Sequence, residues 1–253
     1  MRVSILGCGW FGTALAKSLI GNGIRVKGST TSQNKLDETR THVVNLKTPG
    51  ESVVDPDFFD CDVLVVANNV RMDDEATYLK RVEFTISLIK QFTISRVIFI
   101  SSTSVYGDYN AVVDETTPPQ PETLSARLLF KAEQLFQNAP FACNILRLGG
   151  LIGPGRDPGK FFAGKTNIGN GLAPVNLIHL DDAVGITIQL IGAGVNRAVM
   201  NAVFPDHPNR RDFYTGATMA IGLPPPAFVA ERMQWKIVVS IFRDYQYQHP
   251  LGL

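Results

Sequence analysis

Three glycines near the N-terminus have the spacing of a phosphate-binding turn. They are Gly7, Gly9 and Gly12, and they stand between an apolar run that begins at Val3 and a helical pattern. In such a turn the first glycine permits a tight bend, the second lets the backbone approach a pyrophosphate, and the third lets the helix lie close to the strand. N–H groups at the start of the helix then face the phosphates. Taken alone, the string also fits an ordinary tight turn or the glycine-rich first turn of a methyltransferase.

The residues about 20 positions beyond this turn indicate which dinucleotide it would hold. Sites that prefer NAD place a carboxylate there, where it bonds the ribose 2′-hydroxyl. Here the segment 27–32 reads Lys-Gly-Ser-Thr-Thr-Ser, and the first acid after Gly12 is Asp37. These hydroxyls, with Lys27 and Lys35 nearby, would accommodate a 2′-phosphate. We therefore expect NADP rather than NAD, although such a Ser/Thr cluster also forms ordinary turns.

Short apolar runs alternate with helical patterns along much of the chain. The runs are rich in β-branched residues and cover 3–6, 24–26, 43–46, 63–66, 97–100 and 144–148. Between them apolar residues recur at helical spacing, as at Phe11, Leu15 and Leu19 and in a second stripe at Leu79, Val82, Ile86 and Ile89. Strands that alternate with helices are typical of a parallel sheet. We expect an α/β fold, with a Rossmann-type doubly wound parallel sheet and a small C-terminal lobe.

The pattern changes after residue 148. A glycine-rich stretch with little periodicity runs from Gly149 to about Pro174, which is typical of a loop or a lobe boundary. Helical spacing returns near Asp181. We expect a nucleotide-binding core over 1–150 and a small lobe over 151–253, interleaved with the last helix of the core at about 181–192.

The composition excludes several classes of protein. Hydrophobic residues make up 45% and charged residues 19%, and the formal net charge is +1. A globular chain of this kind has no overall field to attract nucleic acid or an anionic membrane. No apolar run is long enough to span a membrane, and no signal peptide precedes the first strand. Three scattered cysteines, Cys8, Cys61 and Cys143, favour reduced thiols in a cytoplasmic protein.

The four histidines give no sign of a metal site. His42, His179, His207 and His249 are scattered, and none stands at metal-ligand spacing from another histidine or a cysteine. We therefore predict no metal. Asp181 is expected to be a helix N-cap, supported by His179.

Three further segments carry a resemblance to a known family. Residues 101–107 read Ser-Ser-Thr-Ser-Val-Tyr-Gly after a strand, 147–155 run from a strand into Gly-Pro-Gly, and 176–182 read Asn-Leu-Ile-His-Leu-Asp-Asp. With the glycine turn, these motifs stand in the order found in the NAD-dependent epimerase/dehydratase family, the extended short-chain dehydrogenase/reductases. The chain resembles that family. This resemblance argues against the interpretation of the glycine turn as that of a methyltransferase.

The resemblance implies a cofactor at the carboxyl edge of the sheet and a substrate lobe at the C-terminus. Ser102 would be the catalytic hydroxyl, a hydrogen-bond donor to the reacting substrate oxygen, although a serine can also simply end a strand. The residues expected to bind the cofactor are Gly7, Gly9, Trp10, Phe11, Gly12, Ser29, Thr30, Asn45, Leu46, Ala67, Asn68, Asn69 and Ser101. Those expected to bind substrate, unless their loop is merely solvated, are Arg156, Lys160, Lys165, Asn170 and Asn176.

The family's chemistry also uses a Tyr-x-x-x-Lys pair, in which the lysine lowers the pKa of the phenol so that it can exchange a proton near neutrality. Aligned on Glu133, the tyrosine position holds Ser125 and the lysine position holds Leu129. Neither half of the pair is present. Tyr106 or Tyr109 could relay a proton instead, or each could be a packed aromatic.

Two functions follow. One is an NAD(P)-dependent epimerase, dehydratase or reductase that acts on a sugar nucleotide or another small carbonyl or alcohol compound. The other is a non-catalytic NAD(P)-binding sensor or assembly protein. The resemblance also implies a homodimer that pairs helices at about 75–91 and 122–137, which light scattering would detect as a species larger than 27.7 kDa.

Overall fold

The computed structural model describes residues 1–47, 50–68, 74–194 and 198–251. They divide into two compact units. Unit 1 consists of Met1–Val105, Pro121–Arg147 and Val184–Val199, and unit 2 of Tyr106–Gln120, Leu148–Ala183 and Met200–Leu253. Within the described ranges, no helix combines the length and apolarity needed to cross a membrane.

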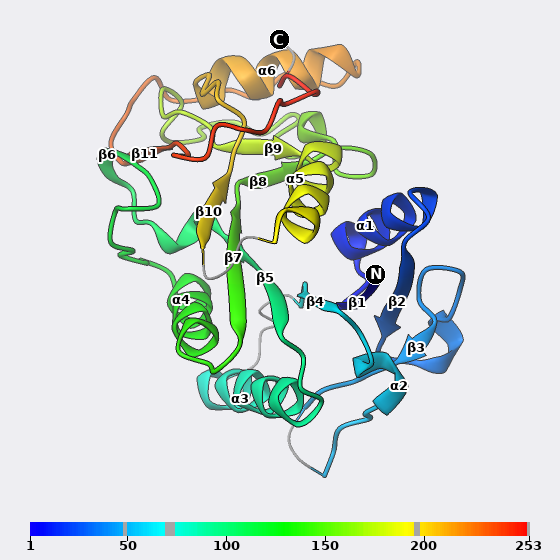
Figure 1. Ribbon diagram of the computed structural model, residues 1–253. Coiled ribbons are helices and arrows are strands. Elements are labelled where there is room, and N and C mark those ends of the chain that lie inside the picture. Colours follow the sequence, from blue (N-terminus) through cyan, green and yellow to red (C-terminus); the bar gives the residue numbers. More distant parts are fainter. Residues whose placement is uncertain (48–49, 69–73, 195–197, 252–253) are drawn as a thin grey trace. The chain divides into compact units, whose positions relative to one another are not determined.

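Seven strands form a parallel sheet (Figure 1), in the order β10-β7-β5-β4-β1-β2-β3. Its strands are β1 Arg2–Leu6, β2 Arg25–Thr30, β3 His42–Val43, β4 Val63–Val66, β5 Arg96–Ser102, β7 Ala142–Leu148 and β10 Val199–Ala202. Strand β1 pairs in parallel with β2 on one side and with β4 on the other. The strand order therefore reverses direction between β1 and β4. In doubly wound sheets this switch point, at the carboxyl ends of the strands, is where ligands bind.

Helices cover both faces of this sheet, with α1 and α5 on one face and α3 and α4 on the other (Figure 1). Their bounds are α1 Trp10–Gly21, α2 Pro56–Phe59, α3 Glu75–Gln91, α4 Leu124–Gln137 and α5 Leu180–Ala193. Because both faces are covered, a central strand has no polar side. All four residues of β4, Val-Leu-Val-Val, are buried. In α1, Phe11, Leu15 and Leu19 are buried at the spacing of four that the sequence showed.

The predicted elements are present with shifted ends. The run 43–46 forms a strand only at His42–Val43, because Asn45 leaves the sheet and forms an antiparallel bridge with Val53. In α3 the buried side chains are Tyr78, Val82 and Ile89, among others, while Leu79 and Ile86 of the predicted stripe are half-buried. The α3 stripe that faces the sheet is thus rotated from the predicted one.

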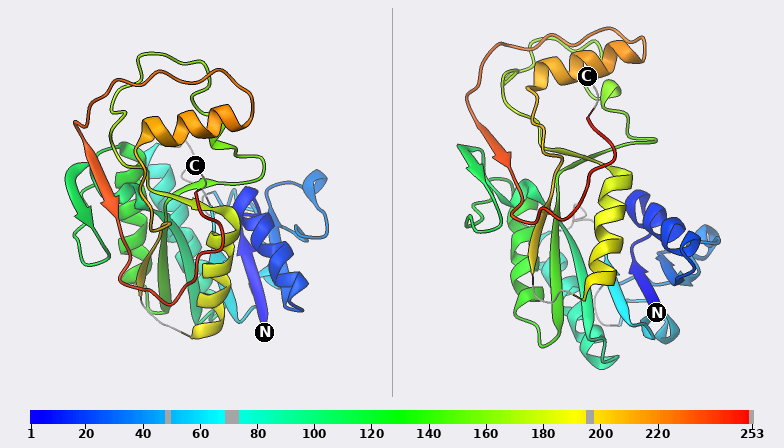
Figure 2. Two further views of the ribbon diagram at one scale, coloured as in Figure 1. Left: turned by 90° about the horizontal axis from the view of Figure 1, so that it is seen from above. Right: turned by 45° about the horizontal axis from the view of Figure 1, so that its top comes forward.

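Unit 2 has two small sheets and its own apolar core. Strand β6 Tyr109–Val113 pairs with β11 Trp235–Val238, and the two lie side by side in each view of Figure 2. Strand β8 Gly150–Ile152 pairs with β9 Leu177–His179. Helix α6 Arg210–Ala220 contributes Phe213 and Tyr214 to a core that also contains Ile152, Val175, Leu177, Phe204 and Leu251. Short 3-10 helices occur at Gln33–Lys35, Thr103–Val105 and Pro158–Lys160.

Candidate functional site

The turn between β1 and α1 requires two of its three glycines for steric reasons. Gly7 has φ +105°, and a Cβ there would lie 2.4 Å from Asn68 Oδ1. A Cβ on Gly12 would lie 2.3 Å from the carbonyl oxygen of Gly7, so a side chain would push the helix away from the strand. The turn is held to β2 by Ser29, whose Oγ accepts from Gly7 N at 2.9 Å and whose carbonyl accepts from Cys8 N at 3.1 Å.

Gly9 faces open space instead. A Cβ there would meet no atom within 4 Å. Gly9 is the N-cap of α1, no side chain in the described part of the protein caps this end, and no acid stands in the first turn. An uncapped helix N-terminus attracts anions, because its backbone N–H groups and the helix dipole point at them.

This turn lines a cavity of about 600 Å³ within unit 1, a volume in the range of small-molecule sites. The predicted residues that line it are Gly7, Gly9, Ser29, Thr30, Asn45, Leu46, Ala67 and Asn68. Thr31 and Lys35, which the sequence offered for a 2′-phosphate, also line it. Further lining residues, which the sequence did not offer as cofactor contacts, are Cys8, Arg40, Val44, Lys47, Glu51, Thr77 and Arg81. Burial raises the pKa of the Cys8 thiol to about 11, so it is neutral at physiological pH.

Some predicted cofactor residues lie elsewhere. Among the described residues, Trp10, Phe11, Gly12 and Ser101 are not part of the cavity lining. Gly12 has the packing role described above. Asn69 lies outside the described residues.

The cations near the cavity differ from the expected pair. Lys35 lines it, but Lys27 donates to the carbonyl of Asp57 at 2.6 Å and pairs with the Asp57 carboxylate at 3.1 Å. Arg40 lines the cavity, whereas Lys27 does not. Its Nε donates to Asp37 at 2.9 Å, and this bond holds the pKa of the Asp37 carboxyl well below its usual range. The sequence signal for Arg40 was a cation shortly after the Ser/Thr cluster.

The hydroxyl of Ser101 belongs to a buried polar cluster. It donates to Glu133, and Arg147 Nη2 donates to the same carboxylate at 2.6 Å. The Glu133 and Arg147 side chains are 0% and 4% exposed. The Ser101 hydroxyl is therefore engaged in a buried hydrogen bond inside unit 1. Its neighbour Ser102 is half-buried and accepts a bond from Ser104 N at 3.1 Å, which leaves its own proton to donate.

Helix α4 shows what replaces the Tyr-x-x-x-Lys pair. Thr123 caps the helix by accepting from Ala126 N at 3.2 Å, so that Ser125 stands in the first turn. Ser125 is exposed and its hydroxyl lies 3.3 Å from Thr123 Oγ1, whereas Leu129 is buried. The helix has no tyrosine, and the lysine position is filled by an apolar side chain.

Tyr106 is a packed aromatic of unit 2. It is 2% exposed, and its hydroxyl lies 2.9 Å from the carbonyl oxygen of Asp114 and 3.2 Å from Asn201 Oδ1. The phenol is thus engaged inside unit 2, which disfavours Tyr106 as the proton relay. Tyr109 is 56% exposed, and its ring covers Gly107.

The polar residues expected to bind substrate divide into two groups. Asn176 donates to the carbonyl of Lys236 at 3.0 Å and accepts from Val238 N at 2.7 Å, so it holds β11 in place. Asn170 accepts from Met233 N at 2.9 Å and donates to the carbonyl of Gln234. Both asparagines have a structural role. The cations Arg156, Lys160 and Lys165 are exposed.

The start of α5 differs from expectation. The helix begins at Leu180, directly after β9, so Asp181 is a first-turn residue rather than the N-cap. The next residue, Asp182, is buried. Burial and the neighbouring His249 lower the pKa of His179.

A parallel sheet with a glycine turn at its switch point defines a dinucleotide-binding Rossmann protein. A family comparison agrees with this class, since the model of the NAD dependent epimerase/dehydratase family matches residues 3–202. The chain belongs to that family.

Relatives and solved structures extend the comparison. Protein YeeZ of Escherichia coli strain K12 is 40% identical over 268 residues, which cover 99% of this chain and 97% of the relative. A functionally unknown conserved protein from Silicibacter pomeroyi DSS has a similar structure, with TM-score 0.76, 24% identity and coverage of 94% and 89% of the two chains. UDP-glucuronic acid 4-epimerase from Bacillus cereus, solved in complex with NAD, gives TM-score 0.75, 17% identity and coverage of 99% and 93%.

Proposed function

We propose that the protein is an NAD(P)-dependent oxidoreductase or epimerase acting on a sugar nucleotide or a small carbonyl or alcohol compound. The observation that carries this proposal is the cavity beside the glycine turn, with open space at Gly9 and an uncapped helix N-terminus. These features fit a pyrophosphate. Family membership and the structural neighbour UDP-glucuronic acid 4-epimerase, solved in complex with NAD, support the choice of cofactor and substrate class.

The glycine turn, the adjoining cavity and Ser102, which is not part of the cavity lining, each have a role in this proposal. Backbone N–H groups of the turn and the dipole of α1 hold the diphosphate, and Asn45 and Leu46 flank the adenine. The bound nicotinamide supplies hydride transfer. Ser102 donates a hydrogen bond to the reacting substrate oxygen, and this bond strengthens as charge develops on that oxygen. The proton donor is not Ser125, because a serine hydroxyl has no accessible pKa near 7 and Leu129 supplies no charge to shift one.

Turnover tests these roles. Ser102→Ala should reduce turnover about 100-fold or more, the effect of losing a donor at a developing oxyanion. Ser125→Ala, the matched serine on α4, should leave it nearly unchanged. The measurement is oxidation or reduction of nicotinamide, with product analysis for epimerisation, over a panel of sugar nucleotides. If Ser102→Ala keeps full activity, the chemistry lies elsewhere in the chain.

A second function, a non-catalytic NAD(P)-binding sensor or assembly protein, is favoured by the buried Leu129 in place of the lysine. Its signature would be dinucleotide binding without turnover of any substrate in the panel. The double variant Ser125→Tyr with Leu129→Lys distinguishes the two functions further, because activity gained in it would show that only the proton relay is absent.

We further propose that NADP binds more tightly than NAD. Lys35 and Arg40 line the cavity with the hydroxyls of Thr30 and Thr31, which suits a 2′-phosphate. Arg40→Ala should weaken NADP about tenfold or more, as expected for loss of a hydrogen bond to a charged group, and should leave NAD little changed. Lys27→Ala is the control, because Lys27 binds Asp57 instead. Calorimetric titration measures both affinities, and tighter binding of NAD by the unaltered protein would contradict the preference.

The homodimer and the cytoplasmic location stay predictions. Half-buried apolar residues on α3, Leu79 and Ile86, support pairing through that helix, because they form a stripe separate from the residues that face the sheet.

A further inference from the structure

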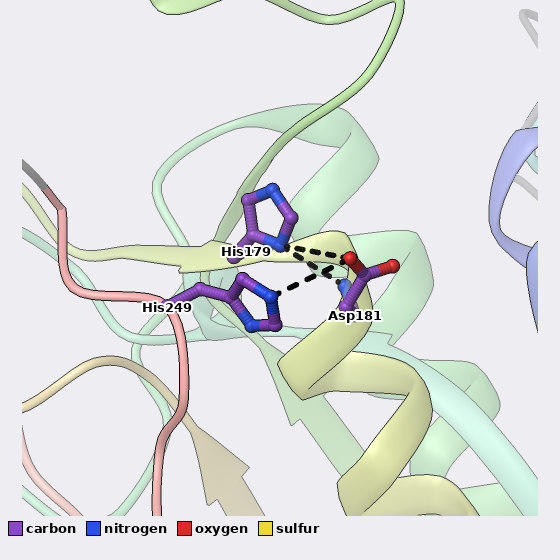
Figure 3. Close-up of side chains that lie close together, drawn as sticks. All are labelled: His179, Asp181 and His249. Atoms are coloured by element: carbon purple, nitrogen blue, oxygen red, sulfur yellow. Dashed lines mark hydrogen bonds and ion pairs between the residues drawn. The ribbon is translucent and has the colours of Figure 1, made fainter.

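Two histidines and an aspartate from distant parts of the sequence meet in unit 2 (Figure 3). His179 is the last residue of β9, Asp181 lies in the first turn of α5, and His249 comes from the C-terminal segment. His179 Nδ1 and His249 Nε2 each lie 3.6 Å from the same atom, Asp181 Oδ2. The two imidazole rings are stacked, with centroids 4.4 Å apart and planes inclined by 19°. Each ring thus has a nitrogen near the same carboxylate oxygen, and binding of one ion through both nitrogens requires the rings to turn out of this parallel stack.

The position of His249 is fixed by the buried carboxylate of Asp182. This side chain accepts from Gln248 N at 2.9 Å, from His249 N at 3.1 Å and from the Tyr245 hydroxyl at 3.2 Å. Leu251, two residues further on, is part of the apolar core of unit 2. The backbone around His249 is thus anchored on both sides. The histidine is held at this place by contacts that do not involve its own ring.

The surroundings of the two rings indicate which nitrogens an ion could use. Asp181 N donates to His179 Nδ1 at 3.3 Å, so the lone pair of this nitrogen points toward Asp181, and a metal ion bound there would replace this long hydrogen bond. His249 Nδ1 is buried and has no hydrogen-bond partner among the described residues, although Asp182 Oδ1 lies 3.3 Å away, so Nε2 is the nitrogen of this ring that faces Asp181. With an ion on Nε2, a small rotation of the ring would let Nδ1 donate to the Asp182 carboxylate, the usual support of a histidine that binds a metal.

The distances also fit a metal ion better than direct bonds. At 3.6 Å neither nitrogen forms a hydrogen bond with Asp181 Oδ2. In a tetrahedral zinc site with ligand distances of about 2.0–2.1 Å, neighbouring ligand atoms are about 3.3–3.4 Å apart. Two of the three separations here are within a few tenths of an ångström of that value, and all three ligand atoms lie within 4.8 Å of one another.

We propose that His179, Asp181 and His249 bind a divalent first-row transition-metal ion such as Zn²⁺, with water in the fourth position. Two imidazoles and one carboxylate are a donor set that such ions accept. The side chains are 21%, 56% and 41% exposed, so an ion can reach them from solvent. The ion would tie the C-terminal segment to the first turn of α5. Sequence spacing predicted no metal because His179 and His249 stand far apart in the sequence, outside metal-ligand spacing.

Titration of the metal-free full chain with Zn²⁺ tests the proposal. Calorimetry should give one site per chain, and Co²⁺ should give the visible absorption of a four-coordinate ion. His249→Ala and Asp181→Asn should each weaken binding 100-fold or more, since each removes a ligand. His42→Ala is the matched control, because His42 also contacts a carboxylate, Asp57 at 2.9 Å, but lies in unit 1. It should bind Zn²⁺ as the unaltered chain does.

A second measurement does not depend on affinity. Zn²⁺ should slow proteolysis of the C-terminal segment in the unaltered chain and in His42→Ala, and should have no such effect in His249→Ala. Far-UV circular dichroism shows whether each variant is folded. If His249→Ala or Asp181→Asn does not fold, His179→Gln is tested in its place. Absence of a one-to-one Zn²⁺ site in the unaltered chain would overturn the proposal, as would undiminished binding in folded His249→Ala and Asp181→Asn.

Discussion

Gly9→Val should abolish dinucleotide binding while the protein stays folded. The substitution is sterically free within the protein, because a Cβ at residue 9 meets no atom within 4 Å and the backbone there is extended, with φ −78°. The added isopropyl group instead enters the cavity at the N-terminus of α1, where we place the pyrophosphate. Loss of affinity should exceed about 100-fold, or about 2.8 kcal/mol of binding free energy.

Calorimetric titration with NAD and NADP measures this loss. Gly21→Val is the matched control, since Gly21 also faces open space but ends α1 far along the helix and does not line the cavity. It should bind both dinucleotides as the unaltered protein does. Undiminished affinity in a folded Gly9→Val protein would show that the pyrophosphate does not approach this turn, and the proposed function would lose its main support.

Glu133→Gln should be among the most destabilising single substitutions in unit 1. The carboxylate of Glu133 is completely buried and accepts from Arg147 Nε at 3.0 Å and Nη2 at 2.6 Å, and from Ser101. The neutral amide has nearly the same shape but removes the Glu133 charge that faces the buried guanidinium. Breaking a buried pair in this way lowers the free energy of unfolding by roughly 3–5 kcal/mol.

Urea unfolding compares this variant with two others. Glu75→Gln removes an exposed ion pair with Lys131 and should change the free energy of unfolding by roughly 0–1 kcal/mol. The double variant Glu133→Leu with Arg147→Met removes both buried charges together and should recover much of the stability that Glu133→Gln loses. Equal stability of Glu133→Gln and Glu75→Gln would contradict a stabilising buried ion pair between Glu133 and Arg147.

The sequence predicted best where the signal is local. The glycine turn, the apolar strands and the helix at Glu75–Gln91 are encoded within segments of a few to about twenty residues, and periodicity reports such segments directly. The loss of the tyrosine and lysine was visible at Ser125 and Leu129 for the same reason. The sequence was less informative about where strands and helices begin and end. The strand expected over 43–46 is short because Asn45 pairs with Val53, a contact outside the pattern of either segment.

Side-chain placement depended on contacts between distant segments. The sequence offered Lys27 as a phosphate ligand, but the acids at 57 and 60 bind its ammonium group, and Arg40 lines the cavity instead. It offered Ser101 as a cofactor contact, but the hydroxyl donates to Glu133, 32 residues away. A polar side chain bonds the partner that the fold brings nearest, and residue type alone does not specify that partner.

By itself, then, the sequence determined the class of fold, the family and the absence of the Tyr-x-x-x-Lys pair, because each is a property of residue order. Only the tertiary structure decided which cations border the cavity, that Tyr106 is packed, and that His179, Asp181 and His249 meet. Contacts of this kind form when the whole chain buries its apolar surface, because folding then brings polar groups from separate segments together. No local sequence pattern encodes such a contact.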